Sequence, residues 1–552
     1  MREASRTSTL STIRHILEEN DISVKIVDDG SHDGIYSVHL HIDCGLLQME
    51  LVTNGKGSNK DQALVSAYGE LMERIQSFVI FPNREAFSAP FKQPDNHHYH
   101  KTLPFHYAPD EKVMSGKDQP DILLPFFDVA KQNVAYLDYR KIEYKSGSNG
   151  IASGSSITEA LLYSIYEIFE RYALRLIYDK SLTPPIIENR TVSKESYADC
   201  TIEILDCSCG IGLPVLGVLL RNTINGDYRF SLCADINTAE AVESAICEIF
   251  QAGQSLKFVH YDIRLMDRMA DDAKLMEKER LKYHNGTNQL PKSFWADTPS
   301  YEPYIALQDN ALDNSSCLKK CIDLISSLGH DLYVRDVSFL SFPTVISFIS
   351  GMSELFDCND NYWTQKTFGK MYDMSLRSHR LPALSPCELD EFITFQSQFS
   401  EPAFTSLFNS GDVWHTGDTR FVLGVIALST ERFDQALRWF DKLLKTTGAN
   451  VPLTNIYNCF RDYANRKSDE QLREKYNPNL VDMVIACHKN QQWKSLFNLT
   501  DCFNCTDCRF KSTCAADNYY TLLNNLMSKY ASNCPNQLHW KEILPRLTQF
   551  IP

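Results

Sequence analysis

The chain contains one acidic pattern twice, in 66-SAYGELMER-74 and in 164-SIYEIFER-171. In each copy two glutamates lie three residues apart and an arginine follows the second. On a helix that turns by about 100° per residue, Glu70, Glu73 and Arg74 fall on one side, and apolar side chains gather on the other. The second copy has the same distribution, so we predict two amphipathic helices, each with one acidic face.

Both helices follow glycine-rich loops, 53-TNGKGSN-59 and 146-SGSNGIASG-154. Backbone N–H groups in such loops, together with the positive end of a helix, favour an anion. Carboxylates from two helices repel one another unless a cation neutralises them, and Mg²⁺ prefers oxygen ligands, phosphate oxygens among them. We therefore predict a site for Mg²⁺ and a nucleotide phosphate between the helices. The alternative for either helix alone is an acidic face turned to solvent.

Neither loop is a Walker A motif, because 55-GKGSNK-60 lacks the required spacing. A third helix is expected over 238–254, where Glu248 and Gln251 lie one turn apart. Glu159 has two interpretations: it contributes to the metal site, or it completes a capping box in 156-SITE-159 and bonds only backbone.

Strand-like runs alternate with long helices in the first part of the chain. The runs are 23-SVKIV-27, 35-IYSVHLHI-42, 46-LLQMELV-52, 213-LPVLGVLL-220, 229-RFSLCADI-236, 331-DLYVRDVSF-339 and 343-PTVISFI-349. They indicate an α+β domain over residues 1–385, with strand pairs and long helices around the nucleotide site. Residues 386–552 are expected to form a separate α-helical domain, because 421–448 is typical of one helix–turn–helix unit of a tetratricopeptide-like (TPR-like) array.

The formal net charge of −15 disfavours broad binding to nucleic acid, which requires a surplus of Lys and Arg. No run of about 18 uninterrupted apolar residues exists, and the first residues lack the apolar centre of a signal peptide. The 17 cysteines are typical of free thiols in a reducing compartment. We therefore expect a cytoplasmic protein that binds neither nucleic acid nor a membrane.

One cysteine group differs from the rest. The segment 502-CFNCTDCRFKSTC-514 has the spacing C-x₂-C-x₂-C-x₅-C and contains Cys502, Cys505, Cys508 and Cys514. Four thiolates this close are costly unless a soft cation binds them, so Zn²⁺ or an iron–sulfur cluster is predicted. Free thiols in a loop, or a working redox centre, are the alternatives.

Three segments together resemble the YcaO family: 53–74, 148–171 and 243–251, in this order and at these separations. The resemblance extends through 331–354 and, more loosely, to about 421–464, and it is greatest to stand-alone bacterial members with a helical C-terminal domain. It implies an ATP and Mg²⁺ site. The matching metal- and phosphate-binding positions are Glu70, Glu73, Glu167 and Glu170, and the matching positions that line or support the nucleotide are Ser11, Ser66, Arg74, Glu159, Arg171, Glu248 and Gln251.

Three positions depart from the family pattern. Ala4 stands where the founding bacterial member has a lysine, and 251-QAGQ-254 lacks an arginine that usually follows the third segment. The final residues, 545-PRLTQFIP-552, lack the P-x-P-x-P tail of azoline-forming members, which leaves thioamidation or a non-catalytic role more open.

The resemblance implies an enzyme that activates a peptide backbone amide by ATP-dependent O-phosphorylation. Its products would be azoline rings or thioamides in a ribosomally synthesised peptide. The alternative is an accessory or scaffold factor for methylthiolation of a ribosomal protein. We expect a peptide or protein substrate and a separate protein that presents it, and we leave a homodimer open.

Overall fold

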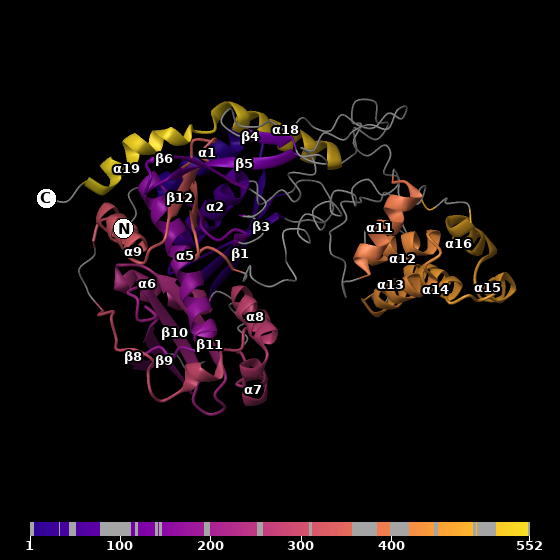
Figure 1. Cartoon of the computed structure of the whole chain (residues 1–552), viewed down its shortest axis with the longest axis horizontal. Helices are drawn as coiled ribbons and strands as arrows, with labels where there is room; N and C mark the ends of the chain where they lie inside the picture. Colours follow the sequence, from indigo (N-terminus) through magenta and orange to yellow (C-terminus); the bar gives the residue numbers. More distant parts are fainter. Residues whose placement is uncertain are drawn as a thin grey trace.

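In the computed structural model, the described residues are 5–32, 34–42, 51–77, 112–115, 120–138, 142, 146–191, 199–250, 258–307, 312–355, 384–397, 419–446, 451–489, 493 and 515–549. They form a mixed body of helices and sheets and a further group of helices (Figure 1). The expected α+β class of the first part and the helical character of the second are both confirmed.

The first sheet has three antiparallel strands in the order β1-β2-β3, which span Val24–His32, Ile35–Ile42 and Leu51–Gly57. Helix α2 (Lys60–Gln76) packs on β2 and β3, and α1 (Arg6–Glu19) packs on α2. The apolar side of α2 meets the sheet: Leu71 is fully buried with Val38 and Leu40 of β2. Glu70, on the acidic side of α2, faces the edge strand β3.

The second sheet has the order β4-β5-β12-β13-β7, and β6 also pairs with β5. These strands span Lys112–Ser115 (β4), Pro120–Asp128 (β5), Asn133–Asp138 (β6), Ile151–Ser153 (β7), Leu332–Asp336 (β12) and Thr344–Ile349 (β13). Helix α5 (Ile157–Asp179) contacts β7 and β13, and α9 (Asn314–Ser327) packs on α5. The apolar side predicted for α5 is its buried side, since Leu161, Ile165 and Ile168 are fully buried.

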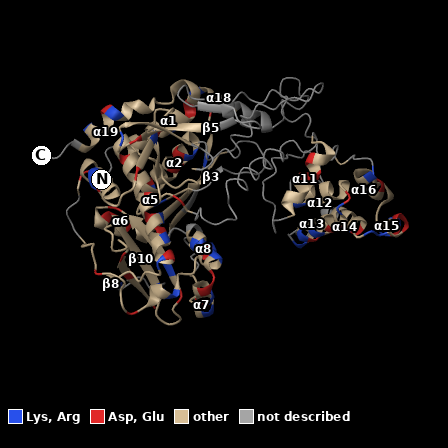
Figure 2. Ribbon diagram, viewed as in Figure 1, with Lys and Arg blue, Asp and Glu red and all other residues tan. Residues whose placement is uncertain are grey.

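The third sheet has the antiparallel order β11-β10-β9-β8, with bounds Tyr228–Ala234 (β11), Val215–Asn222 (β10), Cys200–Asp206 (β9) and Ile186–Thr191 (β8). Helix α6 (Thr238–Phe250) packs on β10 and β11 and also contacts β3 of the first sheet. After it come α7 (Ile263–Asp271), α8 (Ala273–Leu281), η3 (Lys282–Asn285) and η4 (Lys292–Trp295). Acidic and basic residues are interspersed along α5 and α8 (Figure 2).

The helical group has one apolar core, with buried residues from Leu384 to Trp493. Its helices are α11 (Pro386–Gln396), α12 (Thr419–Ser429), α13 (Phe433–Thr446), α14 (Val451–Ala464), α15 (Asp469–Lys475) and α16 (Pro478–Lys489). Helices α12 and α13 form the expected pair within 421–448, and its TPR-like character stays a prediction.

The end of the chain differs from the expected arrangement. Helix α18 (Ala515–Asn533), η8 (Gln537–His539) and α19 (Trp540–Gln549) do not belong to the core of the helical group. Met527 and Tyr530 are buried with α1 and α2, and Trp540 is buried in the core that contains α5 and α9. The expectation that 386–552 is one helical unit therefore does not describe this packing (Figure 1). Contacts between the last helices and the first domain join residues far apart in the sequence, so no pattern of neighbouring residues predicts them.

None of the helices in the described part of the chain combines the length and the low polarity that crossing a membrane requires.

Candidate functional site

Most of the segment expected as a glycine loop, 53–59, is strand, because β3 extends to Gly57, and its glycines bring β3 unusually close to α2. A Cβ atom on Gly55 would lie 1.9 Å from the carbonyl oxygen of Ala63, so only glycine fits there. As a result, the backbone N–H of Asn54 donates a hydrogen bond of 2.9 Å to Oε2 of Glu70. The other oxygen, Oε1, accepts from the guanidinium of Arg74. Glu70 is therefore held by Arg74 of its own helix and by β3.

The glycine loop before α5 holds Glu167 in a similar way. The backbone N–H of Gly150 donates to Oε2 of Glu167 at 3.0 Å. Gly150 has φ +86°, and a Cβ atom there would lie 2.4 Å from the carbonyl oxygen of Ser347. Glu170, one turn further along α5, accepts from the backbone N–H of Ala234 at 2.8 Å. Each of these two glutamates thus retains one oxygen that is not used by these bonds.

Direct contacts bring α2 beside α5. Oγ of Ser153, just before α5, donates to the carbonyl oxygen of Gly69 in α2 at 2.8 Å. At the end of α2, Nε2 of Gln76 donates to the carbonyl oxygen of Phe342 at 2.8 Å, and the N–H of Leu340 donates to its Oε1 at 2.9 Å. These contacts explain how the two acidic faces come to interact.

The carboxylates affect one another electrostatically. Burial raises the pKa of Glu73 well above its ordinary value, and Glu167 and Glu70 raise it further. Burial is also the main reason why the pKa of Glu170 is raised to about 7, against the lowering effect of the Ala234 N–H and Arg171. The pKa of Glu167 is raised by burial and by Glu70. Such carboxylates would gain from a nearby cation, because it stabilises their charged forms.

Lys56, next to the last residue of β3, is a residue at this site that our sequence reasoning missed. Its Nζ pairs with Glu248 of α6, and it interacts with Glu170 and Glu70. Burial lowers its pKa to about 8. The available signal was a lysine between two glycines, directly beside the predicted anion-binding loop.

The other predicted residues lie in different settings. Glu159 is buried and caps the start of α5: it accepts from the N–H of Ser155 at 2.7 Å and from the hydroxyl of Tyr163 at 2.9 Å. Arg171 lies over the ring of Tyr283, 5.6 Å from the centroid. Ser66 is partly buried on α2, whereas Ser11 is exposed on α1. Outside the described residues lie Gln251, Cys502, Cys505, Cys508 and Cys514.

The donor set fits a metal that binds together with a nucleotide. Within the described ranges, no three His, Cys, Asp or Glu side chains are grouped so as to hold a metal ion by themselves. Mg²⁺ often uses only one or two carboxylates and takes its other ligands from phosphate oxygens and water. Carboxylate oxygens left available on α5, beside glycine loops, suit that mode of binding.

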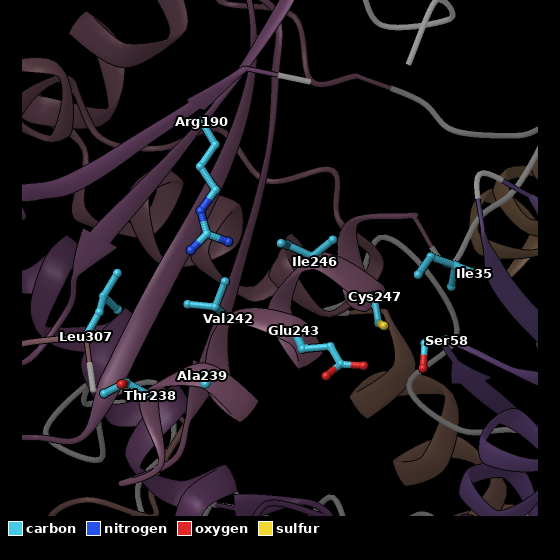
Figure 3. Close-up of a pocket in the computed structure, with 10 residues that line it drawn as sticks. All are labelled: Ile35, Ser58, Arg190, Thr238, Ala239, Val242, Glu243, Ile246, Cys247 and Leu307. Atoms are coloured by element: carbon cyan, nitrogen blue, oxygen red, sulfur yellow. The ribbon is translucent and has the colours of Figure 1, made fainter. Parts of the chain in front are cut away.

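A cavity of about 390 Å³ lies beside Ser58, just after β3 (Figure 3). It is lined by Ile35, Ser58, Arg190, Thr238, Ala239, Val242, Glu243, Ile246, Cys247 and Leu307. Ser58 belongs to the loop, and the six residues from Thr238 to Cys247 belong to α6.

Comparison with known proteins finds similarity to one protein family and to two curated proteins. Residues 54–353 match the family model described as YcaO cyclodehydratase, ATP- and Mg²⁺-binding. The ribosomal protein S12 methylthiotransferase accessory factor YcaO of Escherichia coli is 23% identical over 482 residues, which cover 77% of this chain and 80% of that protein. An uncharacterised protein of Haemophilus influenzae is 24% identical over 377 residues, covering 61% of this chain and 62% of that protein.

Two solved structures are more distant. YcaO from Methanopyrus kandleri, bound with AMPPCP and Mg²⁺, has a TM-score of 0.42 and 17% identity, covering 64% of this chain and 92% of that one. A heterocyclase in complex with substrate and cofactor has a TM-score of 0.43 and 14% identity. This alignment covers 64% of our chain and 53% of the heterocyclase.

Proposed function

The chain belongs to the YcaO family, and from this membership we propose that it uses ATP and Mg²⁺ to activate a backbone amide of a peptide. One observation carries the proposal. The acidic faces of α2 and α5 lie close enough that Glu70 raises the pKa of Glu167 and Glu167 raises the pKa of Glu73. A triphosphate and its metal ion need this combination of carboxylates and backbone N–H groups.

The chemistry follows from the weak reactivity of an amide. A nucleophile, which is a neighbouring Cys, Ser or Thr side chain or an external sulfide, adds to the carbonyl carbon. The carbonyl oxygen then takes the terminal phosphoryl group of ATP, ADP is released, and the oxygen later departs as phosphate. An internal nucleophile leaves an azoline, and sulfide leaves a thioamide. When bound, Mg²⁺ neutralises charge on the phosphates.

The residues of this chain would act mainly by positioning. We propose that the available oxygens of Glu167 and Glu170 bind the metal ion, with Glu73 beside them. Glu70 would keep Arg74 and the first loop in place, because it bonds both. Lys56 would provide positive charge near the phosphates. Positioning of this kind supplies much of the catalysis in phosphoryl transfer. The remaining expected contacts, from Ser11, Ser66, Glu159, Arg171, Glu248 and Gln251, stay proposals of the same kind.

The test is mass spectrometry of a candidate peptide after incubation with protein, ATP and Mg²⁺, with phosphate release measured in parallel. We expect the peptide to lose one water or to exchange one oxygen for sulfur. Glu70→Gln and Glu170→Gln should abolish the change, whereas Glu240→Gln, at an exposed position on α6, should not. Unaltered product formation in both site variants would refute the proposal.

A second candidate function is that of an accessory factor in the modification of a ribosomal protein. It is favoured by the Escherichia coli relative, which bears that name and matches over 80% of its length. The helical group with its own core offers a surface for a partner protein. On this view the chain binds nucleotide but changes no peptide by itself, and affinity purification should recover a stable partner. A separate substrate-presenting protein is compatible with both functions.

A further inference from the structure

The cavity beside the first glycine loop is built from three parts of the fold. Helix α6 forms one wall, β2 and the loop after β3 form the second, and β8 with the segment near Leu307 forms the third. In Figure 3, Val242 and Ile246 lie at the centre, with Arg190 above them and Ser58 to one side. Its volume of about 390 Å³ lies within the range of small ligand sites.

The floor of this cavity is apolar. Ile35, Val242 and Ile246 line it, and Leu307 remains 39% exposed at its edge. Apolar surface of this kind gains free energy when another apolar group covers it. The dimensions suit one large aliphatic side chain together with the backbone next to it.

Of the two charged residues that line the cavity, Arg190 and Glu243, only Arg190 is matched by an opposite charge. The guanidinium of Arg190 donates to both oxygens of Glu188, at 2.7 and 3.0 Å, so its charge is matched. Lys56 is matched by Glu248. Glu243, in contrast, is exposed and has no hydrogen bond or ion pair to any residue in the described part of the chain. A positively charged group on a ligand would therefore be favoured, in agreement with the chain's net charge of −15.

The cavity and the glutamate site share the same two elements. Lys56, near the end of β3, interacts with the glutamates, and Ser58, just after β3, lines the cavity. In α6, Glu248 pairs with Lys56 and the preceding residue, Cys247, lines the cavity. An extended peptide advances by about 3.3 Å per residue, so one bound peptide can reach both places within a few residues.

We propose that this cavity is a specificity subsite, which binds an aliphatic side chain of the peptide substrate and selects basic residues beside it through Glu243. The inference rests on the peptide-activating function proposed above. It adds the class of sequence recognised near the modified amide.

Saturation-transfer NMR with capped pentapeptides tests the subsite on the full chain. The probes are Gly-Lys-Leu-Lys-Gly, the same peptide with Ser in place of Leu, and Gly-Glu-Leu-Glu-Gly. We expect the first to bind about tenfold more tightly than either of the others, a difference of about 1.4 kcal/mol. Equal binding of the three peptides, or none, would overturn the proposal.

Two pairs of variants on α6 assign the effect to the cavity. Glu243→Gln should remove most of the preference for lysine over glutamate, while Glu240→Gln, which changes an exposed carboxylate outside the cavity, should preserve it. Ala239→Trp should fill the cavity and weaken the binding of all three peptides. Glu240→Trp should leave their binding unchanged. Thermal melting of each variant establishes that it is folded.

Nucleotide binding, measured separately with AMPPCP and Mg²⁺, distinguishes this inference from the proposed function. If wild-type protein binds no nucleotide but retains the peptide preference, the proposed reaction fails and the subsite stands. If nucleotide binds but the peptide preference is absent, the subsite fails alone. If Ala239→Trp loses nucleotide as well as peptide, the cavity belongs to the nucleotide and the inference is overturned.

Discussion

At the scale of single residues, the glutamates of the site depend on backbone N–H groups that the fold brings to them. Asn54, Gly150 and Ala234 each donate to one glutamate, from three different segments. A backbone donor fixes a carboxylate without supplying a full positive charge. Carboxylates held in this way keep a strong attraction for a cation.

Glu170→Gln is expected to stabilise the nucleotide-free protein at alkaline pH. The pKa of Glu170 is raised from 4.5 to about 7, so ionisation costs folding free energy as the pH rises through that range, and the cost is complete above it. Glutamine is uncharged and can still accept from Ala234. We expect a gain of more than about 1 kcal/mol at pH 8.5 and little change at pH 4.5, measured by thermal melting.

Glu240→Gln is the matched control, since Glu240 is exposed on α6 and its loss should leave the melting profile unchanged at both pH values. A Glu170→Gln variant that is equally destabilised at pH 4.5 and 8.5 would contradict this prediction. It would show that the surrounding residues stabilise the ionised carboxylate without a bound cation.

Gly150→Ala should be more damaging than Gly147→Ala, although both residues have a positive φ. Left-handed backbone costs a residue with a Cβ about 1–2 kcal/mol at either position. At Gly147 a Cβ would meet nothing within 4 Å, whereas at Gly150 it would meet Ser347 O at 2.4 Å and Ile168 Cδ1 at 2.8 Å. We expect at least about 2 kcal/mol of additional destabilisation for Gly150→Ala.

The same variant should weaken nucleotide binding, because it moves the N–H that fixes Glu167. Similar melting temperatures and similar nucleotide affinities for the two alanine variants would contradict this account.

At the scale of elements, α2 is positioned at its C-terminal end by one buried side chain. Gln76 is fully buried and bonds Leu340 and Phe342, in the segment that connects β12 to β13, and Thr344, the first residue of β13. These bonds link α2 to the sheet on which α5 packs. The relative position of the two acidic faces therefore depends on an amide at the far end of α2.

Gln76→Leu should destabilise the protein by about 2–4 kcal/mol and lower nucleotide affinity, because the buried N–H of Leu340 loses its acceptor and the Phe342 carbonyl loses one donor. Thr344→Val removes only one of the three contacts and should cost less, about 1 kcal/mol. Thermal melting and nucleotide titration measure both effects. If Gln76→Leu melts like wild type, the contact does not hold α2 in place.

At the scale of the whole molecule, the last helices return to the first domain. Arg335 of β12 is buried and donates to the hydroxyl of Tyr530 in α18 and to the carbonyl oxygen of Pro125, both at 2.7 Å. Gln537 accepts from the N–H of Asp336 and donates to its carbonyl oxygen. The C-terminal segment thus packs against β12, in the sheet on which α5 also packs.

His539 gives this closure a pH dependence. Its Nε2 lies 3.2 Å from Oδ2 of Asp336. Burial lowers the pKa of His539, but the ion pair with Asp336 and the hydrogen bond to the Asn536 carbonyl outweigh burial and raise the pKa above its ordinary value. The stabilisation is therefore complete below about pH 6.5 and is lost as the pH rises through the folded-state pKa.

His539→Gln should accordingly lower the melting temperature more at pH 6 than at pH 8.5. At pH 6 we expect a loss of about 1–2 kcal/mol in the free energy of unfolding. His260→Gln is the control: His260 also pairs with an aspartate, Asp227, but it is exposed, so its loss should cost little. Equal losses for His539→Gln at both pH values would exclude a charged pair.

Much of the site could be predicted from local pattern. The spacing of Glu70, Glu73, Glu167 and Glu170 defined two helix faces. The N–H groups of the two glycine-rich segments were expected to bind an anion, but Asn54 and Gly150 donate to Glu70 and Glu167 instead, and anion binding there stays a prediction. The contribution of Lys56 was missed, because its partner Glu248 lies on a helix far along the chain. The domain expected over 386–552 was drawn from helical periodicity, which does not reveal the body on which a helix packs.

The sequence by itself determined which segments are helices, which side of each is acidic and where glycine is required, because these properties arise from the periodicity and sterics of neighbouring residues. Only the tertiary structure decided that Ala234 fixes Glu170, that Gln76 positions α2 and that the final helices close over β12. Each of these contacts joins residues far apart in the chain. Their energy comes from the burial of complementary surfaces, and that burial exists only once the whole fold has formed.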